Sequence, residues 1–186
     1  RIADDISDKK AQGDTVVTTL DAQIQQVAYK SLGNYQGAVI VMEPDTGKII
    51  AMVSKPDYDP NTVKKDWSSL TAEGSTVLYN RATQGKYAPG STLKPLTAIA
   101  ALESGATTVR EKIYDSGKWT YPGYSASYTY CWKRSGHGSL NVRGAIMNSC
   151  NYFFAEMGYR MGMDTLREYY AKFGLGAPTG IEIGDT

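Results

Sequence analysis

Ser91 and Lys94 are the residues whose types and spacing first suggest chemistry. They lie three positions apart in "PGSTLKPLTAIAALESG", residues 89–105, where an apolar run follows the turn-forming pair Pro-Gly. Helical spacing stacks the two side chains on one side of a helix. The run leaves no polar face, so we expect a helix that is buried on most sides.

Lys94 stands in the first turn of this expected helix, where the helix dipole favours acids rather than cations. Burial and the dipole both disfavour the ammonium form, so we expect a lowered pKa for Lys94. A neutral lysine beside a serine hydroxyl is a general base beside a nucleophile. The backbone N–H of Ser91 could stabilise an oxyanion, and the pair therefore predicts acyl transfer. The alternative is a lysine that extends to solvent from a helix end. The same spacing at Ser7 and Lys10 lies in a polar stretch that nothing desolvates.

A β-hairpin and a helix are expected before the Ser91 segment. Apolar runs at 38–42 and 49–53, joined by residues with Pro and Gly turn chemistry, predict the hairpin. Thr19 or Asp21 could cap a preceding helix, whose apolar positions follow helical spacing until Gly33 ends it.

The remaining segments are expected to be loops and helices. Residues 56–90 predict loop with short helices, and 118–138 predict an aromatic loop. That loop could line a substrate groove or stack on glycan sugars, although packing onto the body of the protein is favoured. Helices are expected over 141–148, 151–161 and 165–173.

Composition limits the function classes. The chain has 186 residues, 41% hydrophobic, and a net charge of +1, which fits a globular piece with one core and no polybasic nucleic-acid binding. Residues 1–13 are expected to be a mobile lead-in, and 14–186 a partial domain. No apolar run approaches the length of a membrane span.

The sequence does not assign a single role to either cysteine or to the one histidine. Cys131 and Cys150 could form a disulfide or remain two buried thiols. The chain has only His137 as a histidine, so we expect no metal site and no cofactor. His137 could act as a general base, but its flanking glycines favour a turn, and a serine and lysine mechanism does not need it.

The sequence resembles the penicillin-binding protein transpeptidases, which cross-link peptidoglycan. Their signature begins with S-x-x-K, followed by S-x-N and then K-T-G. The resemblance covers most of the chain in order, through segments such as "TTLDAQIQQVAYKSL", "GAVIVMEPDTGKIIAMVSKPDYDPN", "NRATQGKYAPGSTLKPLTAIAALESG" and "SGHGSLNVRGAIMNSCNYFFAEMGYRMG". The resemblance implies an α/β (α+β) fold of the penicillin-binding protein and serine β-lactamase type. The N-terminal matches look most like the monofunctional type.

The second motif has two candidates. Ser139-Leu140-Asn141 has a sufficient explanation in Asn141 as a helix cap. Ser149-Cys150-Asn151 is similar to the family's segment at the junction of two helices, although Ser149 could also be a cap. The resemblance implies that Ser149 relays a proton between Lys94, the nucleophile Ser91 and the leaving group. It also implies that Asn151 holds the substrate's amide and orients Lys94.

The third motif is missing, because no Lys is followed by Thr or Ser and then Gly. In the family that motif lies on a later strand, which binds the substrate carboxylate and gives an oxyanion-hole N–H. The chain therefore looks like the N-terminal portion of a transpeptidase domain with an incomplete site and an unpaired sheet edge. We expect the C-terminal half of the domain to be present as a second chain. Without it, we expect the piece described by this sequence to undergo domain swapping or to aggregate.

The resemblance implies a peptidoglycan D,D-transpeptidase. Its substrates would be stem peptides, β-lactams would acylate Ser91, and no cofactor would be needed. It would work outside the cytoplasm, anchored in the cell membrane through a segment outside this chain, with a membrane glycan polymerase as a further expected partner. The alternatives are a serine β-lactamase-like hydrolase and a non-catalytic β-lactam sensor or binding module. No glutamate has Asn four residues later, which disfavours one lactamase class.

Overall fold

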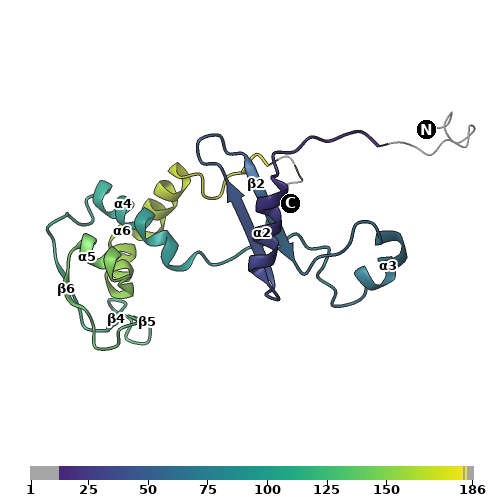
Figure 1. Ribbon diagram of the computed structural model, residues 1–186. Coiled ribbons are helices and arrows are strands. Elements are labelled where there is room, and N and C mark those ends of the chain that lie inside the picture. Colours follow the sequence, from purple (N-terminus) through teal and green to yellow (C-terminus); the bar gives the residue numbers. More distant parts are fainter. Residues whose placement is uncertain (1–12, 182, 184–186) are drawn as a thin grey trace, which may run out of the picture. The chain divides into compact units, whose positions relative to one another are not determined.

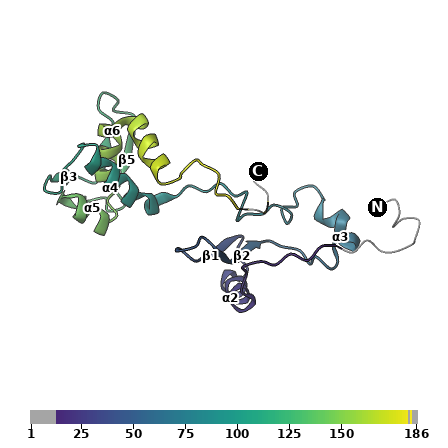
Figure 2. The same cartoon turned by 90° about the horizontal axis from the view of Figure 1, so that it is seen from above.

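The computed structural model describes residues 13–181 and residue 183, which belong to two separate units. The first unit includes residues up to Lys86, and the second runs from Tyr87 to Ile183. The expected lead-in, apart from Gly13, lies outside the described residues. Figures 1 and 2 show the elements of each unit, and each unit is described here by itself.

The first unit is built on a helix packed against a hairpin. Helix α2 (Ala22–Leu32) begins at Asp21, whose carboxylate accepts hydrogen bonds from two N–H groups of the first turn, and ends at Gly33. Strands β1 (Gly37–Met42) and β2 (Ile49–Lys55) pair antiparallel and confirm the predicted hairpin. Ala28 of the helix packs on Ala51 and Val53, which are buried on one face of the sheet.

The remainder of the first unit matches the expected loop. A single short helix, α3 (Val63–Leu70), interrupts residues 56–86 within the described chain. The edge of β2 is partly covered, because the Gln25 side chain bonds both the N–H and the C=O of Met52. On the other face of the hairpin, Ile40 and Met42 remain about half exposed.

Three helices form the centre of the second unit. A 3-10 turn, η1 (Gly90–Leu93), leads directly into α4 (Lys94–Glu103), so the expected helix begins as a tighter turn. Helix α5 (Val142–Met147) and the long α6 (Asn151–Lys172) follow. Figure 1 shows α4 beside α6, and small side chains allow this approach, because Ala98, Ala100 and Ala101 are buried against the Phe153 region.

Two expectations about these helices need correction. Ile99 on α4 is 41% exposed, so the helix is less completely buried than its all-apolar sequence predicts. The separate helices expected at 151–161 and 165–173 are merged into α6, with a break at Gly162, whose φ of 73° is left-handed. Glycine adopts that conformation without the steric cost that a side chain brings.

Short strands replace the expected aromatic loop. Strand β3 (Ile113–Asp115) pairs with β6 (Gly138–Leu140), and β4 (Lys118–Thr120) pairs with β5 (Tyr128–Tyr130). The aromatic side chains of this region pack mainly on one another and on α6. Trp119 is buried, and its indole N–H donates to Glu156 of that helix. Only Trp119 agrees with the expected packing onto the body, because the other aromatic side chains of the segment are 41–66% exposed, namely Tyr121, Tyr124, Tyr128, Tyr130 and Trp132.

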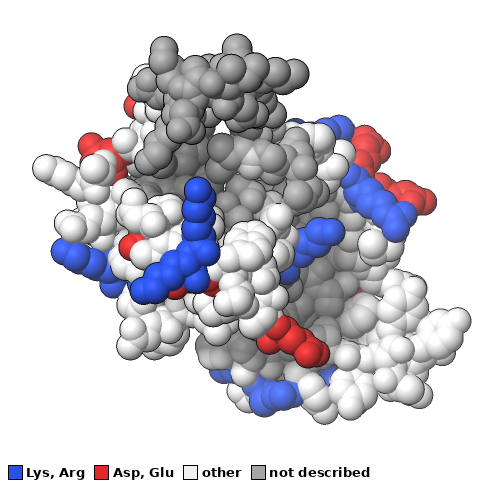
Figure 3. Space-filling view, turned by 90° about the vertical axis from the view of Figure 1, so that its right-hand side faces the viewer, with Lys and Arg blue, Asp and Glu red and all other residues white. Residues whose placement is uncertain are grey.

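Two general features of the described residues complete the fold. None of the helices formed by residues 13–181 has the length and hydrophobicity that crossing a membrane requires. Figure 3 shows side chains of both charges interspersed on the face in view.

Gly117 and Gly136 are positions where the fold leaves no room for a side chain, and Gly117 has the shorter contact. The φ of Gly117 is 93°, and a Cβ there would lie 1.9 Å from the carbonyl oxygen of Arg134. Gly123 has a similar φ of 82° but open space around it. We expect Gly123→Ala to cost about 1 kcal/mol, since only the left-handed backbone is penalised. Gly117→Ala should cost several-fold more because the backbone must also move apart.

Thermal unfolding of the two variants beside the natural protein measures this difference. Equal shifts in melting temperature for the two alanines would show that the close approach of Gly117 to Arg134 does not limit the fold.

Candidate active site

The second unit brings Ser91, Lys94 and Ser149 together in one hydrogen-bonded chain. The Nζ atom of Lys94 lies 3.0 Å from Oγ of Ser149, which lies 3.0 Å from Oγ of Ser91. Ser149 therefore bridges the two residues that the sequence places three positions apart. Ser91 is exposed, whereas Lys94 is half-buried, so the chain runs from solvent into the protein.

Lys94 has three oxygen acceptors, all from the turn that starts α6. Its Nζ atom donates to the Ser149 carbonyl oxygen at 2.7 Å, to Ser149 Oγ, and to Oδ1 of Asn151 at 2.6 Å. An ammonium group has three protons, so this arrangement satisfies its charged form completely. The ring of Phe154 lies on a further side, with its centroid 5.7 Å from Nζ.

The backbone at Ser149 is in a conformation that side-chain-bearing residues rarely adopt. Its φ is 48°, in the left-handed region. This costs about 1 kcal/mol or more, and such strain clusters at functional sites. The consequence here is geometric, because both the carbonyl oxygen and the hydroxyl of Ser149 face Lys94.

The elements around this turn fix it from several sides. The Cys150 N–H donates to the carbonyl of Ala145 in α5, and the Cys150 sulfur accepts from the Phe153 N–H as the N-cap of α6. The Asn151 amide donates to the carbonyl oxygen of Tyr130 at the end of β5. On the other side, the Tyr170 hydroxyl bonds Thr97, one turn beyond Lys94.

Burial lowers the pKa of Lys94 below its ordinary value, because removal from water penalises the ammonium form. The nearby Cys150 and Cys131 act weakly in the opposite direction. A lowered pKa makes proton release from Lys94 easier near neutral pH. The arrangement can therefore transfer a proton between Lys94 and Ser91 through the Ser149 hydroxyl, whose hydrogen can rotate.

The two candidates for the second motif lie in different places. Asn141 caps α5, with its side chain accepting from the Gly144 N–H, as a purely structural role predicts. Ser139 is exposed on β6. Of the two candidates, the Ser149 to Asn151 segment is the one that accepts hydrogen bonds from the Lys94 side chain in the described part of the chain.

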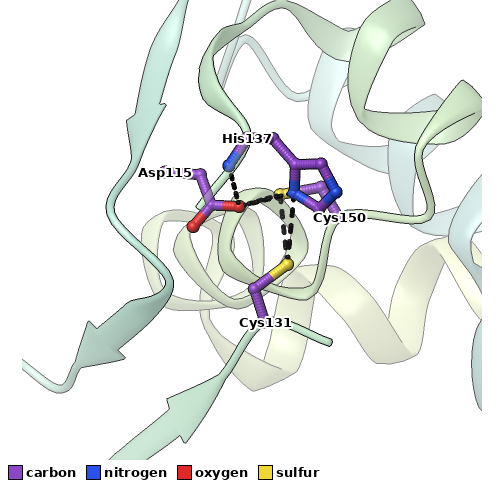
Figure 4. Close-up of side chains that lie close together, drawn as sticks. All are labelled: Asp115, Cys131, His137 and Cys150. Atoms are coloured by element: carbon purple, nitrogen blue, oxygen red, sulfur yellow. Dashed lines mark hydrogen bonds and ion pairs between the residues drawn. The ribbon is translucent and has the colours of Figure 1, made fainter. Parts of the chain in front are cut away.

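A second cluster of polar residues is buried directly behind the Ser149 turn. Figure 4 shows Asp115, Cys131, His137 and Cys150 pointing toward one another. Asp115 Oδ2 lies 2.7 Å from His137 Nδ1 and 3.2 Å from the Cys150 sulfur, and the two sulfurs are 3.9 Å apart. Both cysteines are free thiols, and both are fully buried. The cluster therefore fixes Cys150, the residue between Ser149 and Asn151.

The thiol of Cys150 and the carboxyl group of Asp115 have pKa values that are shifted in opposite directions. Burial raises the pKa of the Cys150 thiol to about 12, and the Asp115 carboxylate contributes to the rise. Burial alone would raise the pKa of Asp115 as well, but hydrogen bonds from His137, the Gly117 N–H and the thiols outweigh it and lower that pKa. The Nε2 atom of His137 is buried and has no hydrogen-bond partner among residues 13–181.

These four residues could hold a metal ion. Each offers one ligand atom, and the four atoms lie within 4.8 Å of one another. Two sulfurs, one imidazole and one carboxylate form a donor set that suits tetrahedral Zn²⁺. The single histidine of the chain predicted no metal site. In the structure, Asp115 and the two cysteines offer the other possible ligands beside His137. No motif spacing signals the four residues, because they come from separate strands and turns.

Comparisons with known proteins agree with this geometry. The sequence profile of the penicillin binding protein transpeptidase domain matches residues 37–186. Peptidoglycan D,D-transpeptidase MrdA of Escherichia coli strain K12 is 42% identical over 178 residues, which make up 93% of this chain and 28% of that protein. The chain thus spans less than a third of this relative.

Solved structures give the same result. A crystal structure of Pseudomonas aeruginosa PBP2 in complex with WCK 5153 has a TM-score of 0.83 at 32% identity, covering 92% of this chain and 40% of that one. Penicillin-binding protein A from M. tuberculosis, as a ceftriaxone acyl-enzyme complex, has a TM-score of 0.80 at 33% identity, covering 95% and 43%. The predicted fold class is confirmed, and the chain belongs to the penicillin-binding protein transpeptidase family.

Proposed function

We propose that the protein is a serine D,D-transpeptidase of peptidoglycan synthesis in which Ser91 is the nucleophile. The single observation that carries this proposal is the chain of hydrogen bonds from Lys94 through Ser149 to Ser91. It joins a lysine with a lowered pKa to an exposed serine at the start of a helix. Family membership supports the same chemistry, since one similar structure is an acyl-enzyme complex.

The first step forms the acyl-enzyme. Neutral Lys94 accepts a proton through Ser149 as Ser91 Oγ attacks the carbonyl carbon between the two terminal D-alanines of a stem peptide. The C–N bond of that peptide breaks, and D-alanine leaves with a proton returned along the same chain from Lys94. The Ser91 backbone N–H is in the first turn of η1, where N–H groups lack helical acceptors, and it stabilises the oxyanion.

The second step transfers the acyl group. An amine of a neighbouring stem peptide attacks the Ser91 ester and gives up a proton through Ser149 to Lys94. The cross-link forms as the ester bond breaks, and Lys94 returns that proton through Ser149 to Ser91 Oγ, which restores the hydroxyl and the neutral amine. Asn151 has a role in both steps. Its Oδ1 holds Lys94, and its amide, which donates to Tyr130 through one N–H, has a second N–H for the substrate.

The same proposal gives the location of the reaction and the further strand that its substrate site needs. Cross-linking takes place outside the cytoplasm, and the K-T-G strand of the family completes the substrate site. β-Lactams imitate the donor peptide and acylate Ser91. The lactamase alternative differs from this proposal in the fate of that acyl group, whereas in the sensor or binding-module alternative acylation is a signal or does not occur.

Acylation by a penicillin is the first test of this proposal. After incubation with a penicillin in the presence of the C-terminal half of the domain, we expect an intact mass increased by one penicillin per protein, and no increase in Ser91→Ala. The adduct should last for many minutes. The absence of an adduct on demonstrably folded protein would refute the acyl-enzyme role, and rapid loss of the adduct would favour a lactamase.

Because the pKa of Lys94 is lowered, we expect the rate of acylation to depend on pH. The acylation rate should rise with pH as Lys94 loses its proton, with a midpoint below the ordinary lysine value of about 10.4. Stopped-flow acylation by a chromogenic β-lactam across pH 6–10 measures the midpoint. A rate that falls over this range would mean that the ammonium form of Lys94, rather than the neutral amine, is required.

Ser149 and Ser139 are a matched pair, since each begins one candidate S-x-N motif. Ser149→Ala interrupts the hydrogen-bonded chain, so we expect acylation to slow by about 100-fold or more. Ser139→Ala removes an exposed hydroxyl and should leave the rate within about twofold. Equal rates for the two variants would show that Ser149 is not the proton relay.

A further inference from the structure

The sequence stretch that leads up to Asn151 carries cations and no acids of its own. From Ser116 to Ala155 the sequence contains no Asp or Glu, but it contains four cations at Lys118, Lys133, Arg134 and Arg143. This stretch includes β4, β5 and the turn with Ser149. The whole chain has a net charge of only +1, so this interval is a local excess of positive charge. A bound anion would compensate that excess.

Two of these cations gather around the tyrosines of β5. The Arg134 guanidinium lies over the Tyr130 ring, 3.8 Å from its centroid. Lys118 Nζ lies 4.1 Å from the centroid of Tyr128 and 5.9 Å from that of Tyr130. We name this group, consisting of Lys118, Tyr128, Tyr130 and Arg134, the basic rim. Within residues 13–181, neither of its cations forms an ion pair.

The basic rim is linked directly to the reacting groups. The carbonyl oxygen of Tyr130 accepts a hydrogen bond from Asn151, whose Oδ1 accepts from Lys94. Trp132, two residues further along, donates its indole N–H to Asn148, immediately before Ser149. A substrate peptide that lies against Asn151 therefore meets the basic rim next.

The backbone that carries Arg134 is held firmly. Its carbonyl oxygen lies against Gly117, where not even a Cβ fits, and the Gly136 N–H donates to the carbonyl of Lys133. Cys131 and His137 at the two ends of this loop belong to the buried cluster. A guanidinium stacked on a ring keeps its in-plane N–H groups free for a planar anion. The rim is thus organised before a ligand arrives, which reduces the entropy cost of binding.

We propose that the basic rim, through Arg134 and secondarily Lys118, binds a free carboxylate of the substrate peptide, one located upstream of its terminal D-alanines. This inference rests on the proposed function and adds a preference for acidic over amidated peptides. A carboxylate matches the guanidinium fork with two parallel hydrogen bonds, whereas a carboxamide offers one acceptor oxygen and no charge.

Two synthetic peptides test this preference in the natural protein. Both end in D-alanyl-D-alanine, and they differ only in one upstream side chain, a carboxylate in one and the corresponding carboxamide in the other. The readout is the peptide concentration that halves the rate at which a fluorescent penicillin labels Ser91. We expect the acidic peptide to compete about tenfold better, or about 1.4 kcal/mol.

Variants assign this preference to residues. Arg134→Gln should reduce the ratio between the two peptides to about one, and Lys118→Gln should reduce it in part. Arg167→Gln is the matched control, because Arg167 is an exposed arginine on α6 paired with Asp164. It should keep the tenfold ratio.

Each result decides the proposal. A ratio near one in the natural protein, with labelling intact, overturns the inference and leaves the proposed function standing. An equal loss in Arg167→Gln also overturns it, because net charge would then explain the effect. If Arg134→Gln does not fold, an unchanged ratio in Lys118→Gln overturns it. Failure of the penicillin to label Ser91 refutes the proposed function itself.

Discussion

The second unit depends on how one lysine is held at the start of α4. Lys94 places a positive charge in a half-buried position, and three oxygen atoms from the turn before α6 surround it. Those oxygens come from only two residues, Ser149 and Asn151, and one of them requires a left-handed backbone. The contact between α4 and α6 is therefore both structural and chemical. Packing of small alanines brings the helices close, and the ammonium group fixes their register.

The buried cluster behind the turn explains how a strained backbone persists. Cys150 is held by Asp115, by Cys131 and by its capping bond to α6, so the residues on either side of it have little freedom. A fully buried carboxylate is costly unless its oxygens are satisfied. Here the oxygens of Asp115 accept from His137, the Gly117 N–H and Cys150. The loop that carries Arg134 is attached to the same cluster through Cys131 and His137. The cluster therefore connects the Ser149 turn with the basic rim.

Local sequence signals predicted the features of each unit whose residues are close in sequence. The hairpin, the Asp21 cap and the Gly33 stop follow from alternation and from turn and capping chemistry, and all three are confirmed. Ser91 and Lys94 stand out because a cation in an apolar first turn is unusual. Residues that meet only through tertiary contacts gave no such signal. Asp115 and His137, with 22 positions between them along the chain, looked unrelated. The aromatic segment concealed two strands too short for alternation to show.

The contrast in exposure between Ser91 and Lys94 has a consequence for chemical selectivity. The hydroxyl of Ser91 is open to solvent, whereas the amine of Lys94 lies behind Ser149 with every proton engaged. An electrophile that arrives from solvent meets the serine first, even though a free amine is the stronger intrinsic nucleophile. In the proposed reaction, this difference in exposure would direct reactive compounds to the Ser91 oxygen and would leave Lys94, the proposed base, unmodified.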